Sequence, residues 1–172
     1  MKKNKVFTPP FEYDNSHYTI DGVVPLNLFL GGTIDDGNSI DWQSTLINEL
    51  NSCDTNYPLM IYNPRREKWD SNANSEEVDK QIEWELYHLE RSDVIVMNIL
   101  GNSKSPISLM EIGLFARKGK LIVFCNPSFY RYENVKVVCR KYNIPLYSTN
   151  DILVIKNEIL KMANMPVRKT DV

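Results

Sequence analysis

The chain has 172 residues, of which 42% are hydrophobic and 24% charged, and this mix is typical of one folded domain rather than a disordered or fibrous protein. Its net charge of -2 and pI of about 5.7 exclude the positive field that binds polymeric nucleic acid. Its apolar runs are far shorter than the roughly 20 residues that span a bilayer, and no signal-peptide core follows the basic start. We therefore expect a cytoplasmic protein with no polymeric nucleic-acid partner and no membrane partner.

The three cysteines, Cys53, Cys125 and Cys139, are an odd number without CxxC spacing. Two of them stand in apolar segments, which is typical of thiols that are buried as small hydrophobic groups. We therefore expect neither a metal site nor a disulfide framework, and no cofactor.

Strand-like and helix-like segments alternate five times along the chain. Residues 1–25 lack a clear period and are predicted to form an irregular arm, the domain is predicted at 26–164, and 165–172 are predicted to form a C-terminal tail. Strands are predicted at 26–30, 59–62, 94–99, 121–125 and 145–147. Helices are predicted at 41–51, 74–91, 106–118, 133–142 and 150–163, with Asn74 and Glu77 as a capping pair and Ser105 as a further N-cap.

This alternation predicts an α/β fold, because parallel strands need crossover connections and a helix usually supplies them. The preferred architecture is a single-domain, five-stranded parallel sheet of flavodoxin-like order 2-1-3-4-5 with helices on both faces. Ligands of such sheets bind beyond the carboxyl ends of the strands, where the strand order reverses. The site is therefore expected to involve 31–33, 98–105 and the start of the helix after the third strand.

Two glutamates stand where helical periodicity predicts core residues. Glu85 falls within the apolar stripe of its helix, which consists of Val78, Ile82, Leu86 and Leu89. Glu111 projects from the apolar wall of the next helix, which consists of Ile107, Met110, Leu114 and Phe115. Burying a carboxylate costs several kcal/mol unless it is paired, hydrogen-bonded or protonated. Either each one is paired or caps backbone groups at a helix end, or the two form a site with one charged and one protonated carboxyl group, as in glycosidic-bond chemistry.

Weaker candidates for substrate binding stand at or after the ends of predicted strands: Gly31, Gly32, Thr33, Trp42, Asn63, Arg65 and Asn98. The two glycines could present backbone N–H groups to a sugar hydroxyl or a phosphate, or could form a plain tight turn. Trp42 could stack on a base, although it has the spacing of a core residue. Arg65 ends a strand on the ligand side, or is a solvated loop residue.

Several segments between Leu28 and Tyr147 carry a resemblance to a known family: LFLGGTI with DWQ following, IYNPRR, QIEWELYHLERSDVIVMNI and PISLMEIGLFARKGKLIVFCNP. The most specific segment is Glu-Ile-Gly-Leu-Phe-Ala, which begins at Glu111 shortly after an apolar strand, with Glu85 eight residues before Asp93. Together these segments resemble the nucleoside 2-deoxyribosyltransferase-like family.

The resemblance implies that Glu111 is the nucleophile that attacks the anomeric carbon and holds a covalent 2-deoxyribosyl intermediate. It implies that Glu85 contacts the nucleobase and manages its leaving-group proton, so that the reaction is a retaining double displacement. The partners would be a nucleoside or nucleotide and a free nucleobase. Because the family commonly completes its sites across subunits, we also expect a homo-oligomer.

Ser105 departs from the pattern of transferases that act on free nucleosides, which tend to carry an acidic residue six positions before the nucleophile. A serine there resembles the related deoxynucleoside 5′-monophosphate N-glycosidases, in which a hydroxyl and a helix N-terminus can bind phosphate. Two other readings stay open: cleavage of a larger N-glycoside such as NAD, and a module that senses a nucleotide without turnover.

Overall fold

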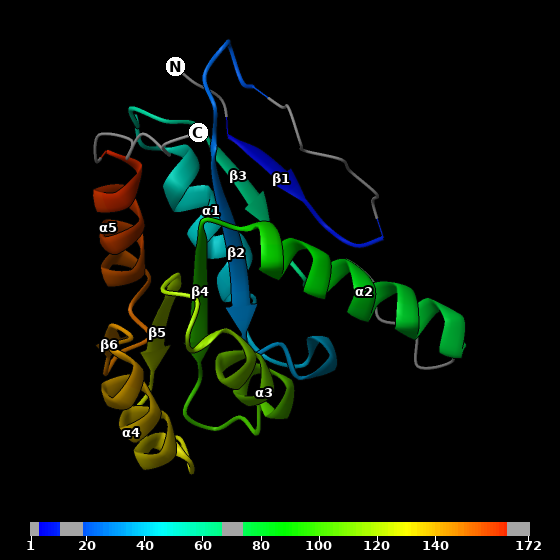
Figure 1. Ribbon diagram of the computed structural model, residues 1–172, viewed down its shortest axis with the longest axis vertical. Helices are drawn as coiled ribbons and strands as arrows, with labels where there is room; N and C mark the ends of the chain where they lie inside the picture. Colours follow the sequence, from blue (N-terminus) through cyan, green and yellow to red (C-terminus); the bar gives the residue numbers. More distant parts are fainter. Residues whose placement is uncertain (1–3, 11–18, 67–73, 165–172) are drawn as a thin grey trace.

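The computed structural model describes residues 4–10, 19–66 and 74–164, and its fold is a parallel sheet covered by helices (Figure 1). The strands are β1 (Lys5–Phe7), β2 (Leu26–Gly32), β3 (Leu59–Tyr62), β4 (Val94–Ile99), β5 (Leu121–Cys125) and β6 (Leu146–Tyr147). The helices are α1 (Trp42–Asn51), α2 (Ser75–Arg91), α3 (Pro106–Phe115), α4 (Tyr132–Tyr142) and α5 (Ile152–Ala163), and a short 3₁₀ turn, η1 (Asp35–Gly37), precedes α1. The predicted C-terminal tail, 165–172, lies outside the described residues.

The sheet has six strands in the order β1-β3-β2-β4-β5-β6, and each neighbouring pair is parallel. The predicted count of five strands is therefore wrong, although the five predicted strands have the predicted relative order. The additional strand, β1, pairs with β3 at the sheet edge, where Lys5 lies opposite Met60 and Phe7 opposite Tyr62. Three residues are too few to show a period, so the arm at 1–25 was predicted to be irregular throughout.

Side chains cap the starts of two helices, one as predicted and one that the sequence analysis did not predict. The side chain of Asp41 accepts a hydrogen bond from the backbone of Ser44 at the start of α1. Asn74 and Glu77 form a reciprocal capping box at the start of α2, as predicted. These bonds satisfy N–H groups that have no partner inside their own helices.

Helices cover both faces of the sheet, as predicted, and each face has its own hydrophobic core. Side chains of α2, α3 and α4 pack on one face: Trp84, Leu89, Ile112, Phe115, Val135 and Cys139. Side chains of α1 and α5 pack on the other: Leu46, Leu50, Ile155 and Ile159. Burial raises the pKa of the Cys125 thiol to about 12 and that of Cys139 to about 11, so these two cysteines are buried as thiols, as predicted.

The buried face of α2 differs from the predicted one. Val78, Ile82 and Leu86 are 43%, 47% and 41% exposed. Of the predicted stripe only Leu89 is buried, and the other buried residues of α2 are Gln81, Trp84 and His88. Aromatic packing determines which face of α2 is buried, because the rings of Trp84 and His88 pack against Tyr62 of the sheet, whereas the aliphatic side chains of the stripe cannot stack on that ring.

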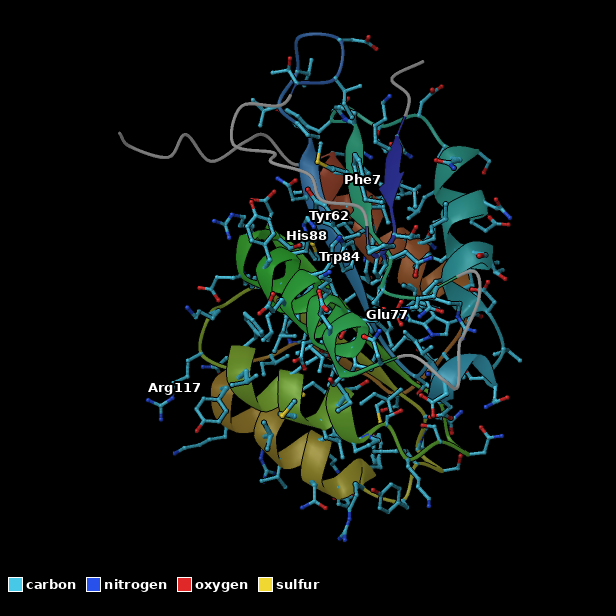
Figure 2. The ribbon with its side chains drawn as sticks, turned by 90° about the vertical axis from the view of Figure 1, so that its right-hand side faces the viewer. Phe7, Tyr62, Glu77, Trp84, His88 and Arg117 are labelled. Atoms are coloured by element: carbon cyan, nitrogen blue, oxygen red, sulfur yellow. The ribbon has the colours of Figure 1, made fainter. Side chains whose placement is uncertain are left out.

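An aromatic cluster joins α2 to the edge of the sheet (Figure 2). The His88 ring stacks on Tyr62 with centroids 4.1 Å apart, Trp84 lies 4.5 Å from His88, and Phe7 stacks on the other side of Tyr62 at 5.8 Å. Burial and, second, the charge of Arg91 lower the pKa of His88 to about 4. The imidazole is therefore neutral at pH 7 and packs as an aromatic ring.

The predicted turn at Gly31 and Gly32 is in fact the end of β2, where these residues lie opposite Met97 and Asn98 of β4. Gly32 has a φ of 128°, and a Cβ added there would lie 2.2 Å from the Asn98 carbonyl oxygen. Glycine at this position therefore allows the carboxyl ends of β2 and β4 to approach closely.

We expect Gly32→Ala to lower the free energy of unfolding by about 2 to 4 kcal/mol, through backbone strain and a clash with Asn98. Urea unfolding measures the change. Gly113 of α3 is the matched control, because a Cβ added there meets no atom within 4 Å. Gly113→Ala should leave stability unchanged or raise it by up to about 1 kcal/mol. Equal effects of the two changes would contradict the role assigned to Gly32.

Candidate active site

The two glutamates singled out by the sequence lie on α2 and α3, which pack side by side on one face of the sheet (Figure 2). Glu111 stands in the second turn of α3, just beyond the carboxyl end of β4, and is 6% exposed. Glu85 stands in the middle of α2 and is partly buried. The two carboxyl groups lie close enough that the charge of one affects the protonation of the other.

The Glu111 carboxyl group holds a proton at neutral pH in the free protein. Burial and, second, the negative charge of Glu85 raise its pKa to about 8. Desolvation and a like charge both disfavour the ionised form. The two carboxyl groups therefore do not both ionise at pH 7, and a proton stays in the site.

Gln81 connects Glu85 to the segment that follows β3. It is 7% exposed, and its side-chain amide donates to Glu85 Oε1 at 2.6 Å and to the Pro64 carbonyl at 3.1 Å. Its amide oxygen accepts a hydrogen bond from Arg66 Nε. Burial raises the pKa of Glu85, and the Gln81 hydrogen bond and the Arg66 charge oppose that rise.

Sequence reasoning missed Gln81. The sequence could have identified it by its spacing, because Gln81 stands four residues before Glu85, and residues four apart are neighbours on the surface of a helix. The wrong choice of buried face on α2 hid that signal, because Gln81 belongs to the face of Trp84 and His88.

Three buried hydroxyl groups fix the start of α3 against the end of β2. The hydroxyl of Thr33 lies 3.0 Å from that of Ser103 and 2.7 Å from that of Ser105, and the two serine hydroxyls are 2.9 Å apart. Thr33 Oγ1 also accepts from the backbone N–H of Leu100 at 3.0 Å. We call Thr33, Ser103 and Ser105 the hydroxyl cluster.

Ser105 is the N-cap residue of α3, but its side chain makes no capping hydrogen bond, contrary to the prediction. Its φ of 43° places it in the left-handed region, which is uncommon for residues other than glycine. Its hydroxyl bonds to the hydroxyl cluster instead of to the first turn of the helix. The cluster thus holds the helix that carries Glu111.

Asn98 extends this connected region at the carboxyl end of β4. Its carbonyl oxygen accepts from the backbone N–H of Thr33 at 2.9 Å, and its side-chain oxygen accepts from Asn150 Nδ2 at 2.7 Å. Asn98 is fully buried, and its Nδ2 has no hydrogen-bond partner within the described part of the chain. Buried donors without a partner are rare, so this N–H group is an unusual feature of the region.

Arg65 is buried, at 8% exposure, and holds the loop before α1. Its guanidinium donates to Gln43 Oε1 at 3.1 Å and to the Ser39 hydroxyl at 2.7 Å, and Nε lies 3.4 Å from the Asp41 carboxylate. Asn63 accepts from the Arg65 backbone N–H at 3.0 Å. The alternative of a solvated loop residue is therefore wrong for Arg65.

Trp42 is 2% exposed in the core beneath α1, and its indole N–H donates to the Thr33 carbonyl at 2.9 Å. The structure thus places this side chain in the core and not on an open surface where a base could stack. Beside it, at the end of β3, lies a hollow of about 450 Å³. The hollow is lined by Val6, Thr8, Gly37, Asp41, Ser44, Ile47, Asn48, Asn63, Arg65 and Arg66.

Two classes of feature are absent from the described ranges 4–10, 19–66 and 74–164. No group of three His, Cys, Asp or Glu side chains there is arranged to hold a metal ion. Within the same ranges, every helix is too short or too polar to cross a bilayer.

Residues 25–129 match the protein family described as nucleoside 2-deoxyribosyltransferase like. The comparison with curated proteins gives no match. Among solved structures, a conserved protein from Enterococcus faecalis is 12% identical at a TM-score of 0.45, with 82% of this chain and 89% of that chain covered.

The raised pKa of Glu111 predicts a dependence of stability on pH. Its folded-state pKa of about 8 lies above the ordinary value of 4.5, so its contribution to stability is present below pH 4.5 and is lost as the pH rises through 8. Glutamine does not ionise, so Glu111→Gln should gain on the order of 3 kcal/mol relative to wild type between pH 5 and pH 9.

Urea unfolding at the two pH values measures this difference. Glu83→Gln, at an exposed position of α2, is the control. Its stability should differ from that of wild type by the same amount at pH 5 and at pH 9. A constant difference between Glu111→Gln and wild type across this range would contradict the protonated state of Glu111.

Proposed function

The chain belongs to the nucleoside 2-deoxyribosyltransferase-like family, and we propose that it transfers 2-deoxyribose between nucleobases, or to water, through a covalent glycosyl intermediate on Glu111. The observation that carries the proposal is the pair of electrostatically coupled carboxyl groups, Glu85 and Glu111, on adjoining helices. Such a pair supplies both groups that glycosidic-bond exchange requires, a nucleophile and a proton donor.

The proposed reaction has two displacements. In the first, an ionised Glu111 oxygen bonds to C1′ while the bond from C1′ to the base nitrogen breaks, and the proton of Glu85 moves to the departing base. In the second, a nitrogen of the incoming base bonds to C1′, the ester bond to Glu111 breaks, and the proton of the incoming base returns to Glu85. With water as acceptor, the products are the free base and deoxyribose.

The proton that the site retains at neutral pH supports this scheme, because the scheme needs one proton for the base and one carboxylate for C1′. In the free protein that proton favours Glu111. It therefore has to pass to Glu85 as the substrate binds, and this transfer leaves Glu111 ionised for attack.

The hydroxyl cluster supports a nucleoside rather than a 5′-monophosphate as the substrate. Thr33 donates its hydroxyl proton to Ser103, and Ser103 donates to the Leu100 carbonyl. The Ser105 hydroxyl must therefore donate within the cluster. A phosphate would have to break that buried hydrogen bond to use the hydroxyl, so its binding would cost the cluster one of its hydrogen bonds.

We further propose that a second copy of the chain covers an apolar surface beside the carboxyl pair. This surface, the α2/α3 apolar face, consists of Val78, Ile82 and Leu86 of α2 and Ile107, Met110 and Leu114 of α3, which are 41% to 56% exposed. Soluble monomers rarely expose contiguous apolar surface beyond a few hundred Å². A two-fold axis pairs one face with its own copy, so a single apolar face suffices for a dimer. Glu85 and Glu111 lie on the same two helices, so this interface would border the site.

The test of the proposed reaction is base exchange with an isotopically labelled free base, using a panel of 2′-deoxynucleosides, their 5′-monophosphates and NAD. We expect exchange on nucleosides, and a covalent deoxyribosyl adduct on Glu111 visible by mass spectrometry. Glu111→Gln should lower the rate at least about 10³-fold, because it removes the nucleophile. The exposed Glu83→Gln is the control and should exchange at the wild-type rate.

The other outcomes of this experiment would each indicate a different substrate or function. Cleavage of monophosphates with intact nucleosides would contradict the substrate choice based on the hydroxyl cluster. Release of base from NAD alone would indicate a glycohydrolase. Binding of nucleotide without product over hours would indicate a sensing module and overturn the enzymatic proposal.

The oligomer proposal predicts that the wild-type chain is at least a dimer in solution. Light scattering coupled to gel filtration should show that Ile82→Glu and Met110→Glu dissociate it, because each change buries a charge in an apolar interface. Leu153→Glu is the matched control, because Leu153 is a 53% exposed apolar residue on α5, outside this face. A monomeric wild type at micromolar concentration, or equal dissociation by Leu153→Glu, would contradict the assigned face.

A further inference from the structure

Gln81 has a side-chain amide whose three contacts fix its orientation. The neighbouring Pro64 carbonyl can only accept a hydrogen bond, and Arg66 Nε can only donate one. The amide nitrogen of Gln81 must therefore face Pro64, and its oxygen must face Arg66. The second N–H of that nitrogen then points at Glu85 Oε1, at 2.6 Å.

This orientation makes Gln81 an obligatory donor to Glu85. An oxygen that accepts this N–H cannot carry the proton of the carboxyl group in the same direction. Glu85 Oε1 is therefore the less favourable site for a proton, and a proton that Glu85 receives is favoured on Oε2. Because Gln81 is 7% exposed, water competes little for this bond.

We propose that Gln81 is a positioning residue, held in place by Arg66 and the Pro64 carbonyl. Its hydrogen bond to Glu85 stabilises Glu85 as the carboxylate, so that in the resting protein the proton of the pair stays on Glu111. The inference rests on the proposed function for its catalytic meaning. It does not rest on that function for the location of the proton, which is a property of the free protein.

The charged groups that act on the pair come from three elements: Glu85 from α2, Glu111 from α3 and Arg66 from the segment after β3. Burial raises the pKa of Glu85, but the Gln81 hydrogen bond and the Arg66 charge lower it. For Glu111, both burial and the Glu85 charge act upward. The asymmetry between the two carboxyl groups thus agrees with the hydrogen bond that only Glu85 receives from Gln81 and with the deeper burial of Glu111.

The consequence for catalysis is a redistribution of one proton between the two carboxyl groups. On substrate binding, the O–H bond of Glu111 breaks and an O–H bond forms on Glu85 Oε2, which leaves Glu111 as the carboxylate. The departing base then takes the proton from Oε2, and the acceptor returns it. Gln81 stays bonded to Oε1 throughout, so it favours Oε2 as the oxygen that exchanges the proton.

The test is a pH titration, without substrate, of protein labelled with ¹³C at its glutamate carboxyl carbons and followed by NMR, with Glu85→Gln and Glu111→Gln used for assignment. Gln81→Leu removes the donor, so the proton should move toward Glu85. The apparent pKa of Glu111 should then fall by about one unit, a tenfold change in its ionisation equilibrium, while that of Glu85 rises.

Three further variants keep the test decisive. Arg66→Met removes the group that orients the amide and also a charge that lowers the pKa of Glu85, so it should shift the titration in the same direction and by more than Gln81→Leu. Gln81→Met, which also lacks the donor, serves if Gln81→Leu does not fold. Gln43→Leu is the matched control, because Gln43 is also a fully buried glutamine that accepts from an arginine, Arg65, but it has no bond to the carboxyl pair. Its titration should equal that of wild type.

Unchanged Glu111 titration in both Gln81→Leu and Arg66→Met would overturn the proposal, as would an equal shift in Gln43→Leu. These outcomes are independent of turnover. An inactive protein with the expected titration would contradict only the proposed function, and an active protein without it would contradict only the role of Gln81.

Discussion

Two carboxyl groups on adjoining helices, in a place that water reaches poorly, cannot both carry a charge, and the rest of the site is organised around this constraint. Glu111 is almost fully buried and feels the charge of Glu85. Glu85 in turn receives a hydrogen bond from Gln81, whose own orientation depends on Arg66. Arg66, in the segment that follows β3, therefore helps to set the protonation state of Glu111 on α3, although Gln81 and Glu85 of α2 lie between them.

The sheet supplies the rigidity that such a pair requires. Gly32 brings the carboxyl ends of β2 and β4 together, and the backbone of Thr33 continues this contact to the Asn98 carbonyl. The hydroxyl cluster then ties the start of α3 to the same point. Glu111 thus stands less than two helical turns from a fixed anchor, a span over which a helix bends little.

Sequence periodicity predicted most elements of this fold, because long strands and capped helices carry strong local signals, and β4 and β5 have the predicted bounds. It missed β1, whose three residues are stabilised by pairing with β3 and not by their own pattern. It also chose the wrong face of α2, since two apolar stripes compete there and aromatic stacking on Tyr62 decides between them. The candidate carboxylates were singled out from apolar stripes that the structure leaves largely exposed, whereas Gln81 and the hydroxyl cluster depend on contacts between segments distant in sequence.

The backbone at Ser105 restricts how a related site can evolve. Its positive φ of 43° is best tolerated by Gly, Asn or Asp, so an aspartate fits the chain conformation there. An ionised aspartate, however, only accepts hydrogen bonds. Thr33 would then donate to the aspartate instead of to Ser103, and Ser103 would donate to it instead of to the Leu100 carbonyl. An acidic residue at this position would therefore reverse the hydrogen-bond polarity of the whole cluster. Residues 33, 103 and 105 form one interdependent unit, and substitutions at these three positions should be correlated among homologues.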